Sequence, residues 1–287
     1  MCICRTYRNS PICQLKINAS HYEAGRNHIE GGEISGTIDE LIRHAVTKLS
    51  HIHFVSNEEA KERLIQMGEC QESIFVIGSP DIEVMKSETL PSLSEVKERY
   101  EIPFDEYAVL IFHPVVTELN TLKSQVEILI LSLIESKRNY VVIYPNNDKG
   151  SNIILNEYEK LKNNNNFKIY PSLRFEYFLT LLKNSKFIIG NSSAGIREAE
   201  VYGVPAVNFG TRQKNRSKNE KIKNVNSDKK SILDAIQEAE TKKITPISHF
   251  GFESKSSKRF FQILKEESIW NVSLQKQFVD LNVKSEK

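Results

Sequence analysis

Strand-like apolar runs alternate with longer amphipathic stretches along this chain of 287 residues, and short loops join them from Thr37 onward. Buried strands that alternate with amphipathic helices indicate a parallel sheet covered by helices on both faces. Asn57 is expected to cap one helix, which Gly68 ends. The pattern therefore predicts an α/β fold. Strands are expected at residues 51–55, 73–77, 108–112, 140–144, 167–170, 187–189 and 206–209.

The elements fall into two βα series that are joined near residues 80–105. Two such series predict two doubly wound domains that face each other across a cleft, with ligands at the carboxyl ends of the strands. The expected boundaries are residues 1–85 for a shortened N-terminal domain, 86–265 for the C-terminal domain and 266–287 for a C-terminal helix that packs back. Helical periodicity covers residues 255–281. Its apolar side chains are expected to pack onto the sheets: Phe260, Phe261, Leu264 and Trp270.

Composition narrows the classes of function. The chain has 39% hydrophobic and 26% charged residues, as an ordinary globular protein does, and its formal net charge is +2. So small a charge gives no argument for nucleic acid or an anionic membrane as the main partner. The longest mainly apolar runs, such as residues 126–134, are well below the ~18 residues of a membrane span. Residues 1–18 are too polar for a signal peptide, so a cytoplasmic protein is expected.

The four cysteines, Cys2, Cys4, Cys13 and Cys70, include no CxxC pair and have no paired histidines nearby at zinc spacing. Cys2 and Cys4 have a spacing that can bind metal, but three of the four lie in an irregular N-terminal segment. Free thiols in a reducing compartment account for all of them. No metal site is predicted.

The most informative motif lies at residues 190–198 (GNSSAGIRE), between an apolar run at 186–189 and an expected helix at 194–202. This order places Ser192 and Ser193 at the N-terminus of the helix, where unpaired backbone N–H groups and the helix dipole attract anions. Glu198 lies far enough along the helix to accept both hydroxyls of a ribose. The motif therefore predicts a nucleoside diphosphate site, although an ordinary serine-capped helix also explains the two serines.

Other polar residues follow the expected strands: His113 comes directly after one, and Asn146 and Asp148 follow the next. The carboxyl ends of parallel strands share one edge of the sheet, so these side chains and the serine motif are expected to gather there. Basic residues are frequent in the segment 212–230. They either attract a phosphate or form a solvated loop.

A second cluster, residues 28–40 (HIEGGEISGTIDE), places ionisable groups around three glycines. Glycines let a loop approach a ligand closely, so Glu30 and Asp39 can point into one cavity. Paired carboxylates suit the removal and return of a proton. A surface ion pair between Asp39 and Arg43 is the alternative. Simple solvent or packing roles are expected for Glu33, Glu40, His44 and His51.

Taken together, these motifs resemble those of the hydrolysing UDP-N-acetylglucosamine 2-epimerases, which make N-acetylmannosamine for sialic-acid synthesis. The resemblance runs in order from about residue 27 to residue 278. The matching segments are residues 28–33, 35–39, 43–44, 113–115 with Thr117, 145–146 with Asp148, 190–193 with Gly195, 197–198, 210–213 and 275–278.

The resemblance implies two Rossmann-like domains, similar to the GT-B glycosyltransferases, with UDP held mainly by the C-terminal domain. UDP is expected to be eliminated across C1–C2, after which water adds and C2 is reprotonated on the other face. Glu30 and Asp39 match the positions that handle those protons. No cofactor and no metal are implied, and a homodimer is expected. The implied UDP contacts are Ser192 and Ser193 for the diphosphate, Glu198 for the ribose, Leu173 for the uracil, and His113, Asn146, Asp148 and Arg212 along the same pocket.

The chain departs from the family pattern at its front, where only 27 residues precede His28. The resemblance implies a fuller first domain, with a further aspartate that acts beside Glu30 and Asp39. The N-terminal domain is therefore expected to be incomplete, with UDP binding retained and turnover dependent on a replacement for that aspartate. Two other functions stay open, a GT-B glycosyltransferase and a non-catalytic nucleotide-sugar binder. A related branch of the family acts on UDP-diacetylbacillosamine.

Overall fold

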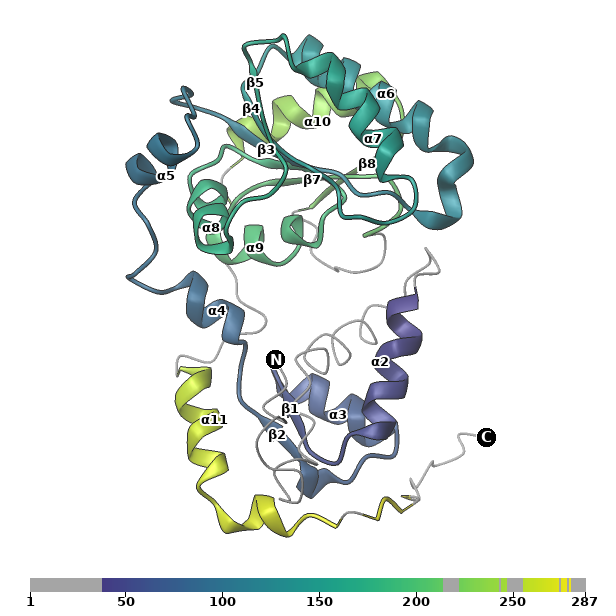
Figure 1. Ribbon diagram of the computed structural model, residues 1–287, viewed down its shortest axis with the longest axis vertical. Helices are drawn as coiled ribbons and strands as arrows, with labels where there is room; N and C mark the ends of the chain where they lie inside the picture. Colours follow the sequence, from purple (N-terminus) through teal and green to yellow (C-terminus); the bar gives the residue numbers. More distant parts are fainter. Residues whose placement is uncertain are drawn as a thin grey trace. The chain divides into compact units, whose positions relative to one another are not determined.

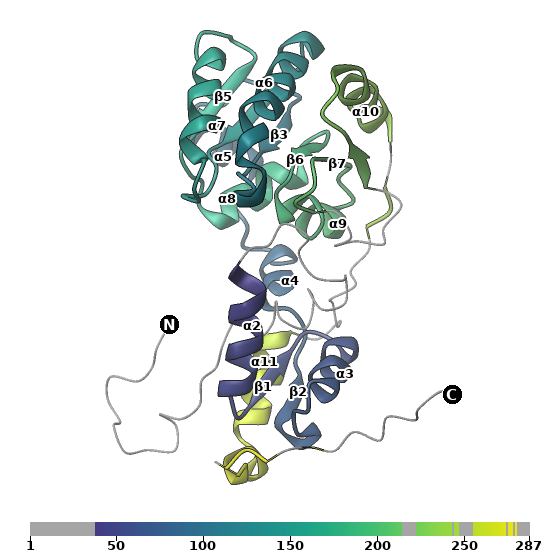
Figure 2. The same ribbon diagram turned by 90° about the vertical axis from the view of Figure 1, so that its right-hand side faces the viewer.

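The computed structural model describes residues 38–213, 222–242, 244–246, 255–273, 275–277 and 279, with side chains from residue 44 onward. The chain forms two compact units, shown in Figures 1 and 2. The first unit includes Ile38–Glu83 and the described part of His249–Lys287, and the second includes Val84–Ser248. Within the described ranges, every helix is too short or too polar to cross a membrane.

The second unit is built on a sheet of six parallel strands in the order β5-β4-β3-β6-β7-β8. The five strands expected in this part of the sequence are present. The sixth strand, β8, was not predicted, because it is a short edge strand in which only Val225 is buried. The strands are β3 Ala108–Ile111, β4 Tyr140–Ile143, β5 Phe167–Tyr170, β6 Ile188–Gly190, β7 Ala206–Phe209 and β8 Lys223–Val225.

Helices cover both faces of this sheet, as the alternating pattern predicts (Figure 1). Successive strand residues point to opposite faces, so Leu110 packs with one helical layer and Val109 with the other. One layer contains α6 Leu119–Ser136, α7 Ser151–Tyr158 and α10 Lys229–Thr241. The other contains α5 Leu93–Arg99, α8 Phe175–Lys183 and α9 Glu198–Tyr202. The remaining short elements are α4 Pro80–Met85 and the 3-10 turns η3 Val116–Glu118, η4 Glu159–Leu161 and η5 Ser193–Gly195.

The strand order reverses between β3 and β6. From β3 the chain moves outward through β4 and β5, then returns to β6 on the other side of β3 and continues through β7 to β8. At such a reversal the loops after the two central strands leave in opposite directions and open a crevice at their carboxyl ends. The topology therefore places any ligand site of the second unit beside the residues that follow β3 and β6.

The first unit contains two parallel strands, β1 His53–Val55 and β2 Ile74–Val76, both at expected positions. Asn57 caps the helix after β1, as predicted, and its side chain accepts a hydrogen bond of 2.8 Å from the backbone N of Ala60. Helix α3 covers one face of the strands and α11 covers the other (Figure 2). The helical elements are α2 Ile38–Leu49, α3 Glu58–Gln66, η2 Gln71–Ser73, α11 Ser256–Leu264 and η6 Glu267–Asn271.

The C-terminal segment differs from the long helix expected at residues 255–281. Helix α11 ends at Leu264, whose carbonyl accepts a hydrogen bond of 3.1 Å from the Trp270 indole. This contact satisfies a carbonyl at the helix end that has no partner within the helix. Phe260 and Leu264 pack against the first unit's strands as predicted. Phe261 instead remains 59% exposed, since a short helix presents only one face to the strands, and Trp270, which lies beyond the helix in η6, is 39% exposed.

Buried Glu69 joins three parts of the first unit. One carboxylate oxygen contacts His53 Nε2 at 3.0 Å and Lys276 Nζ at 2.5 Å, and the other contacts Lys48 Nζ at 3.0 Å. Burial by itself raises the pKa of Glu69, but hydrogen bonds from His53, Lys276 and Lys48 outweigh it and lower the pKa to about 2. Burial lowers the pKa of His53, against the raising effect of Glu69. The C-terminal segment is thereby tied to α2 and β1.

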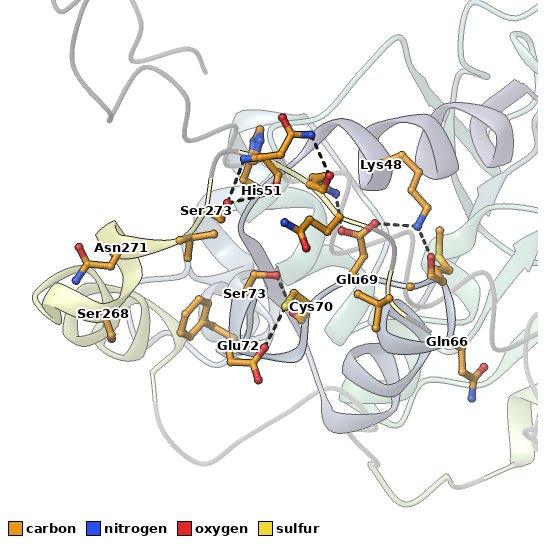
Figure 3. A pocket seen from close by; sticks show the side chains of 18 residues that line it. Lys48, His51, Gln66, Glu69, Cys70, Glu72, Ser73, Ser268, Asn271 and Ser273 are labelled. Carbon is orange, nitrogen blue, oxygen red and sulfur yellow. Dashed lines mark hydrogen bonds and ion pairs between the residues drawn. The ribbon is translucent and has the colours of Figure 1, made fainter. Parts of the chain in front are cut away.

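Glu69 also lines a cavity of about 1280 Å³ (Figure 3). Its other lining residues include Lys48, His51, Gln66 and Ser73, all of which precede β1 or β2 in the chain. The cavity thus lies by the amino ends of these parallel strands. Ligands of doubly wound sheets bind at the carboxyl ends, so this cavity is not where a nucleotide is expected.

Acidification is expected to destabilise the first unit. Glu69 is ionised and His53 is neutral in the folded chain, and both pKa values lie below their ordinary values of 4.5 and 6.5. The unfolded chain therefore binds more protons, so this stability is fully present above pH 6.5 and is lost as the pH falls towards 2. Thermal unfolding at stepwise lower pH measures the effect.

The Glu69→Gln variant is the control for this pH dependence. It should be less stable than the unmodified chain at neutral pH by about 1 to 3 kcal/mol, because buried polar groups are left with poorer partners. Its stability should fall less below pH 4.5, since the titrating carboxyl is gone. Parallel pH profiles for the two proteins would contradict this account of Glu69.

Candidate functional site

The loops after β3 and β6 are joined by one buried asparagine, Asn191, which is 1% exposed. Its side-chain Oδ1 accepts a hydrogen bond of 2.7 Å from the backbone N of His113, and its Nδ2 donates one of 2.8 Å to the carbonyl of His113. Its own backbone N donates to the carbonyl of Ile111 at 3.1 Å. These bonds hold His113 at the strand reversal, where the topology places a ligand site.

His113 is a half-buried, neutral imidazole. Burial, followed by the positive charge of Arg212, lowers its pKa to about 4. Its Nδ1 lies 3.1 Å from the backbone N of Asn146, in the loop after β4, and accepts a hydrogen bond from it. A neutral ring that accepts through Nδ1 carries its proton on Nε2. His113 therefore offers an N–H donor to a ligand oxygen at neutral pH.

The loop after β4 adds two further polar groups. The Asn146 Nδ2 donates to the Asp148 carboxylate at 2.5 Å, and Asp148 itself is exposed. The Oδ1 of Asn146 is buried and accepts no hydrogen bond from any other residue in the described part of the chain. A buried acceptor of this kind suits a hydroxyl or amide N–H of a ligand.

Arg212 lies in the loop after β7 and contacts Asn191. Its Nη1 donates to the carbonyl of Asn191 at 3.1 Å, and Gln213 Nε2 donates to the same carbonyl at 2.9 Å. The preceding Thr211 hydroxyl donates to Glu118, which anchors this loop to the start of α6. The site is therefore assembled from the ends of four strands and carries one guanidinium, a group suited to phosphate oxygens.

Gly190, the last residue of β6, has a backbone conformation that requires glycine, with φ of +129°. A Cβ atom placed there would lie 2.0 Å from the carbonyl oxygen of Ile111. That oxygen is also the acceptor for the backbone N of Asn191. Glycine at this position thus permits the close approach of β3 and β6 on which the asparagine contacts depend.

The helix expected at residues 194–202 is wrong in its first half. Ser193–Gly195 form a single 3-10 turn, and α9 begins only at Glu198. The backbone N–H groups of Gly195 and Ile196 donate to carbonyls three residues earlier, at 3.1 and 2.9 Å, which is the 3-10 pattern. Ser192 does cap the turn, since its hydroxyl accepts from the backbone N of Ala194 at 3.3 Å. Both serines remain partly exposed beside Asn191.

Two other expected contact residues lie farther along the chain from these loops. Glu198 occupies the first turn of α9 and is buried. Leu173 follows β5 by three residues and packs, partly buried, with Tyr100 and Tyr170 against the core. The described contacts thus join the expected residues His113, Asn146, Asp148 and Arg212 through Asn191.

Comparison with known proteins identifies the family of this chain. A family model for UDP-N-acetylglucosamine 2-epimerase matches residues 13–265. The chain belongs to the UDP-N-acetylglucosamine 2-epimerase family. It is 49% identical over 259 residues to the UDP-N-acetylglucosamine 2-epimerase of Neisseria meningitidis. That alignment covers 89% of this chain and 68% of the Neisseria protein. It is 34% identical to the hydrolysing UDP-N,N′-diacetylbacillosamine 2-epimerase of Legionella pneumophila, over 87% of this chain and 66% of that protein.

Solved epimerase structures share the fold. The UDP-GlcNAc 2-epimerase of Methanocaldococcus jannaschii, solved in complex with UDP-GlcNAc and UDP, aligns with a TM-score of 0.63 and 22% identity. The alignment covers 84% of this chain and 67% of that one. This likeness confirms the predicted α/β, GT-B-like fold class. The chain spans about two thirds of the length of the epimerases it matches.

Within this epimerase chain, Glu30 lies outside the described residues, and Asp39 is described only as backbone in the first turn of α2. Their expected catalytic roles therefore stay predictions. Asn191 and Gln213 were not expected as site residues. A sequence signal for Asn191 existed, because it follows the last glycine of a buried strand and precedes the serine pair. Its side-chain target, the backbone of His113, is 78 residues away and left no pattern in the sequence.

Proposed function

We propose that this chain converts UDP-N-acetylglucosamine and water into N-acetylmannosamine and UDP. The observation that carries the proposal is the group at the strand reversal: neutral His113, clamped by Asn191 and set beside Arg212. Such a site pairs a guanidinium for phosphate with a neutral N–H donor. Support also comes from the 49% identical Neisseria relative, whose name states this substrate.

In the proposed mechanism the second unit holds the nucleotide. Ser192, Ser193 and Arg212 bind the diphosphate, Glu198 accepts the ribose hydroxyls, and Leu173 lies beside the uracil. His113 donates its Nε2 proton in a hydrogen bond to a ligand oxygen, and the Asn146–Asp148 pair lines the same pocket. Arg212 and His113 then face the negative charge that grows on UDP as it leaves, which is where preorganised donors lower a barrier most.

Chemistry at the sugar needs two proton transfers. A carboxylate removes the C2 proton, the C1–O bond breaks, and its electron pair leaves with UDP to give an acetamido-glycal. Water then adds its oxygen to C1, while a proton returns to C2 on the opposite face. We assign these transfers to Glu30 and Asp39, and no cofactor is required because no hydride leaves. The product serves sialic-acid-type sugar synthesis, and the family resemblance supports a cytoplasmic homodimer.

A second substrate is favoured by one specific observation. The 34% identical Legionella relative is named for UDP-N,N′-diacetylbacillosamine, a UDP-sugar whose two sugar nitrogen atoms are both acetylated. The higher identity to the Neisseria protein ranks UDP-N-acetylglucosamine first. Parallel incubations with each UDP-sugar rank the two by kcat/KM.

The deciding experiment incubates the purified chain with UDP-N-acetylglucosamine in deuterium oxide and follows the mixture by NMR. The expected result is N-acetylmannosamine and UDP in equal amounts, with deuterium at C2 of the product, because the returning proton comes from solvent. Binding of the UDP-sugar without formation of N-acetylmannosamine and free UDP would refute the proposed enzyme activity. A sugar product without deuterium at C2 would point to glycosyl transfer instead.

A further inference from the structure

Asn191 contacts several strand ends of the site at once. Its side chain binds both backbone polar groups of His113, after β3, and its carbonyl receives Arg212 and Gln213, after β7. The ring of His113 in turn receives the backbone N of Asn146, after β4. Asn191 thus connects the ends of β3, β6 and β7 directly, and the end of β4 through His113.

The chemistry of these contacts requires a carboxamide. The two bonds to His113 run in opposite senses, one accepted by Oδ1 and one donated by Nδ2, at 2.7 and 2.8 Å. An ionised aspartate has the same shape but only accepts hydrogen bonds, so its second oxygen would face the His113 carbonyl. Alanine would leave a buried N–H and a buried C=O of His113 without partners.

The two sides of Asn191 contact two different groups of the site, the neutral imidazole strand end and the charged guanidinium. Its side chain fixes the strand end that carries the neutral imidazole, and its carbonyl orients the guanidinium. An exchange of either contact for water would let His113 and Arg212 move independently. Rigid placement matters because donors act on a developing charge only when they are held in place beforehand.

We propose that Asn191 is the positioning residue of the nucleotide site. It holds His113 and Arg212 in the relative positions that let both bind one diphosphate group. The residue acts through its neighbours and need not touch the substrate. The identity of the ligand, UDP, rests on the proposed function, whereas the positioning of His113 does not.

Asn208 provides a matched control. It is a buried asparagine on β7, the strand next to β6, and its Nδ2 donates to Asn224 at 2.7 Å, on the side away from β6. Truncation at either position removes a buried amide, from β7 at Asn208 and from the residue that follows β6 at Asn191. Only truncation at Asn191 removes contacts with His113. Thermal unfolding of each variant first fixes a temperature at which all of them are folded.

Two readouts are then measured on the full chain carrying Asn191→Ala, Asn191→Asp or Asn208→Ala. NMR titration of the histidine rings follows His113 without any ligand. Its pKa, lowered to about 4 in the native chain, should move towards 6.5 in both Asn191 variants and stay unchanged in Asn208→Ala. Calorimetric titration with UDP should show affinity weakened by about tenfold or more in both Asn191 variants and unchanged in the control.

The outcomes separate this inference from the proposed function. Asn191 variants with a native His113 titration, or with losses matched by Asn208→Ala, would overturn the positioning role even if the chain makes N-acetylmannosamine. A native chain that binds UDP without turnover would refute the enzyme activity, while the shifts at Asn191 would still support positioning. With no UDP binding by the native chain, the proposed function fails and the His113 titration alone decides.

Discussion

The Gly190→Ala variant is expected to be strongly destabilised and to lose UDP binding. A methyl group at position 190 would lie 2.0 Å from the carbonyl oxygen of Ile111, so β3 and β6 must separate. The φ of +129° adds backbone strain for any residue with a Cβ. Together, strain and overpacking predict a loss of roughly 2 to 6 kcal/mol in the free energy of unfolding. Chemical denaturation of the two proteins measures it.

Gly210→Ala is the matched control for this substitution. Gly210 also has a positive φ, +85°, but a Cβ there has no neighbour within 4 Å. Only the conformational penalty of about 1 to 2 kcal/mol applies. The difference between the two variants isolates the clash with Ile111. Equal losses at both glycines would show that close contact between β3 and β6 is not what position 190 requires.

Substitution of the two expected catalytic carboxylates should give the largest loss of activity. Glu30→Gln and Asp39→Asn keep the shape of each side chain but cannot take or return a proton. Each is expected to lower kcat by roughly 10²- to 10⁴-fold, the usual contribution of a general acid or base. UDP affinity should stay unchanged, because the proposed nucleotide contacts all belong to the second unit. Product formation by NMR and UDP binding by calorimetry separate the two effects.

Glu33→Gln tests whether any nearby carboxylate would give the same result. Glu33 lies in the same acidic segment, and a solvent role is expected for it, so its variant should keep near-native turnover. Full activity in either Glu30→Gln or Asp39→Asn would remove that residue from the mechanism. Loss of UDP binding in these variants would instead mean that the segment supports the nucleotide site.

The sheet of the second unit was the most predictable part of the molecule. Strands such as β3 and β4 are almost entirely buried apolar runs, which are visible directly in the sequence. The edge strand β8 was missed because two of its three residues are exposed, so its pairing with β7 rests on backbone hydrogen bonds and on the contact between Asn208 and Asn224. Backbone pairing at an edge leaves little hydrophobic signal.

Some residues of the candidate site were expected from the sequence, but their geometry was not. His113, Asn146 and Asp148 were expected from their positions after strands, because parallel strands bring their carboxyl ends to one edge, whereas Arg212 was expected only from the family resemblance. The turn at Ser193–Gly195 was expected as helix, because a serine cap precedes a 3-10 turn as readily as it precedes an α-helix. Capping preferences of this kind leave the type of the first turn open.

By itself, the sequence determined the α/β class, the parallel strands and the residues at their carboxyl ends, since these follow from hydrophobic periodicity and short-range turn signals. Its motifs also indicated the epimerase family, which the comparisons confirmed. Only the tertiary structure decided that Asn191 joins His113 to Arg212, that His113 is neutral, and that Gly190 must lack a side chain. Those properties depend on contacts between segments up to 78 residues apart, and such contacts exist only after the sheet has formed.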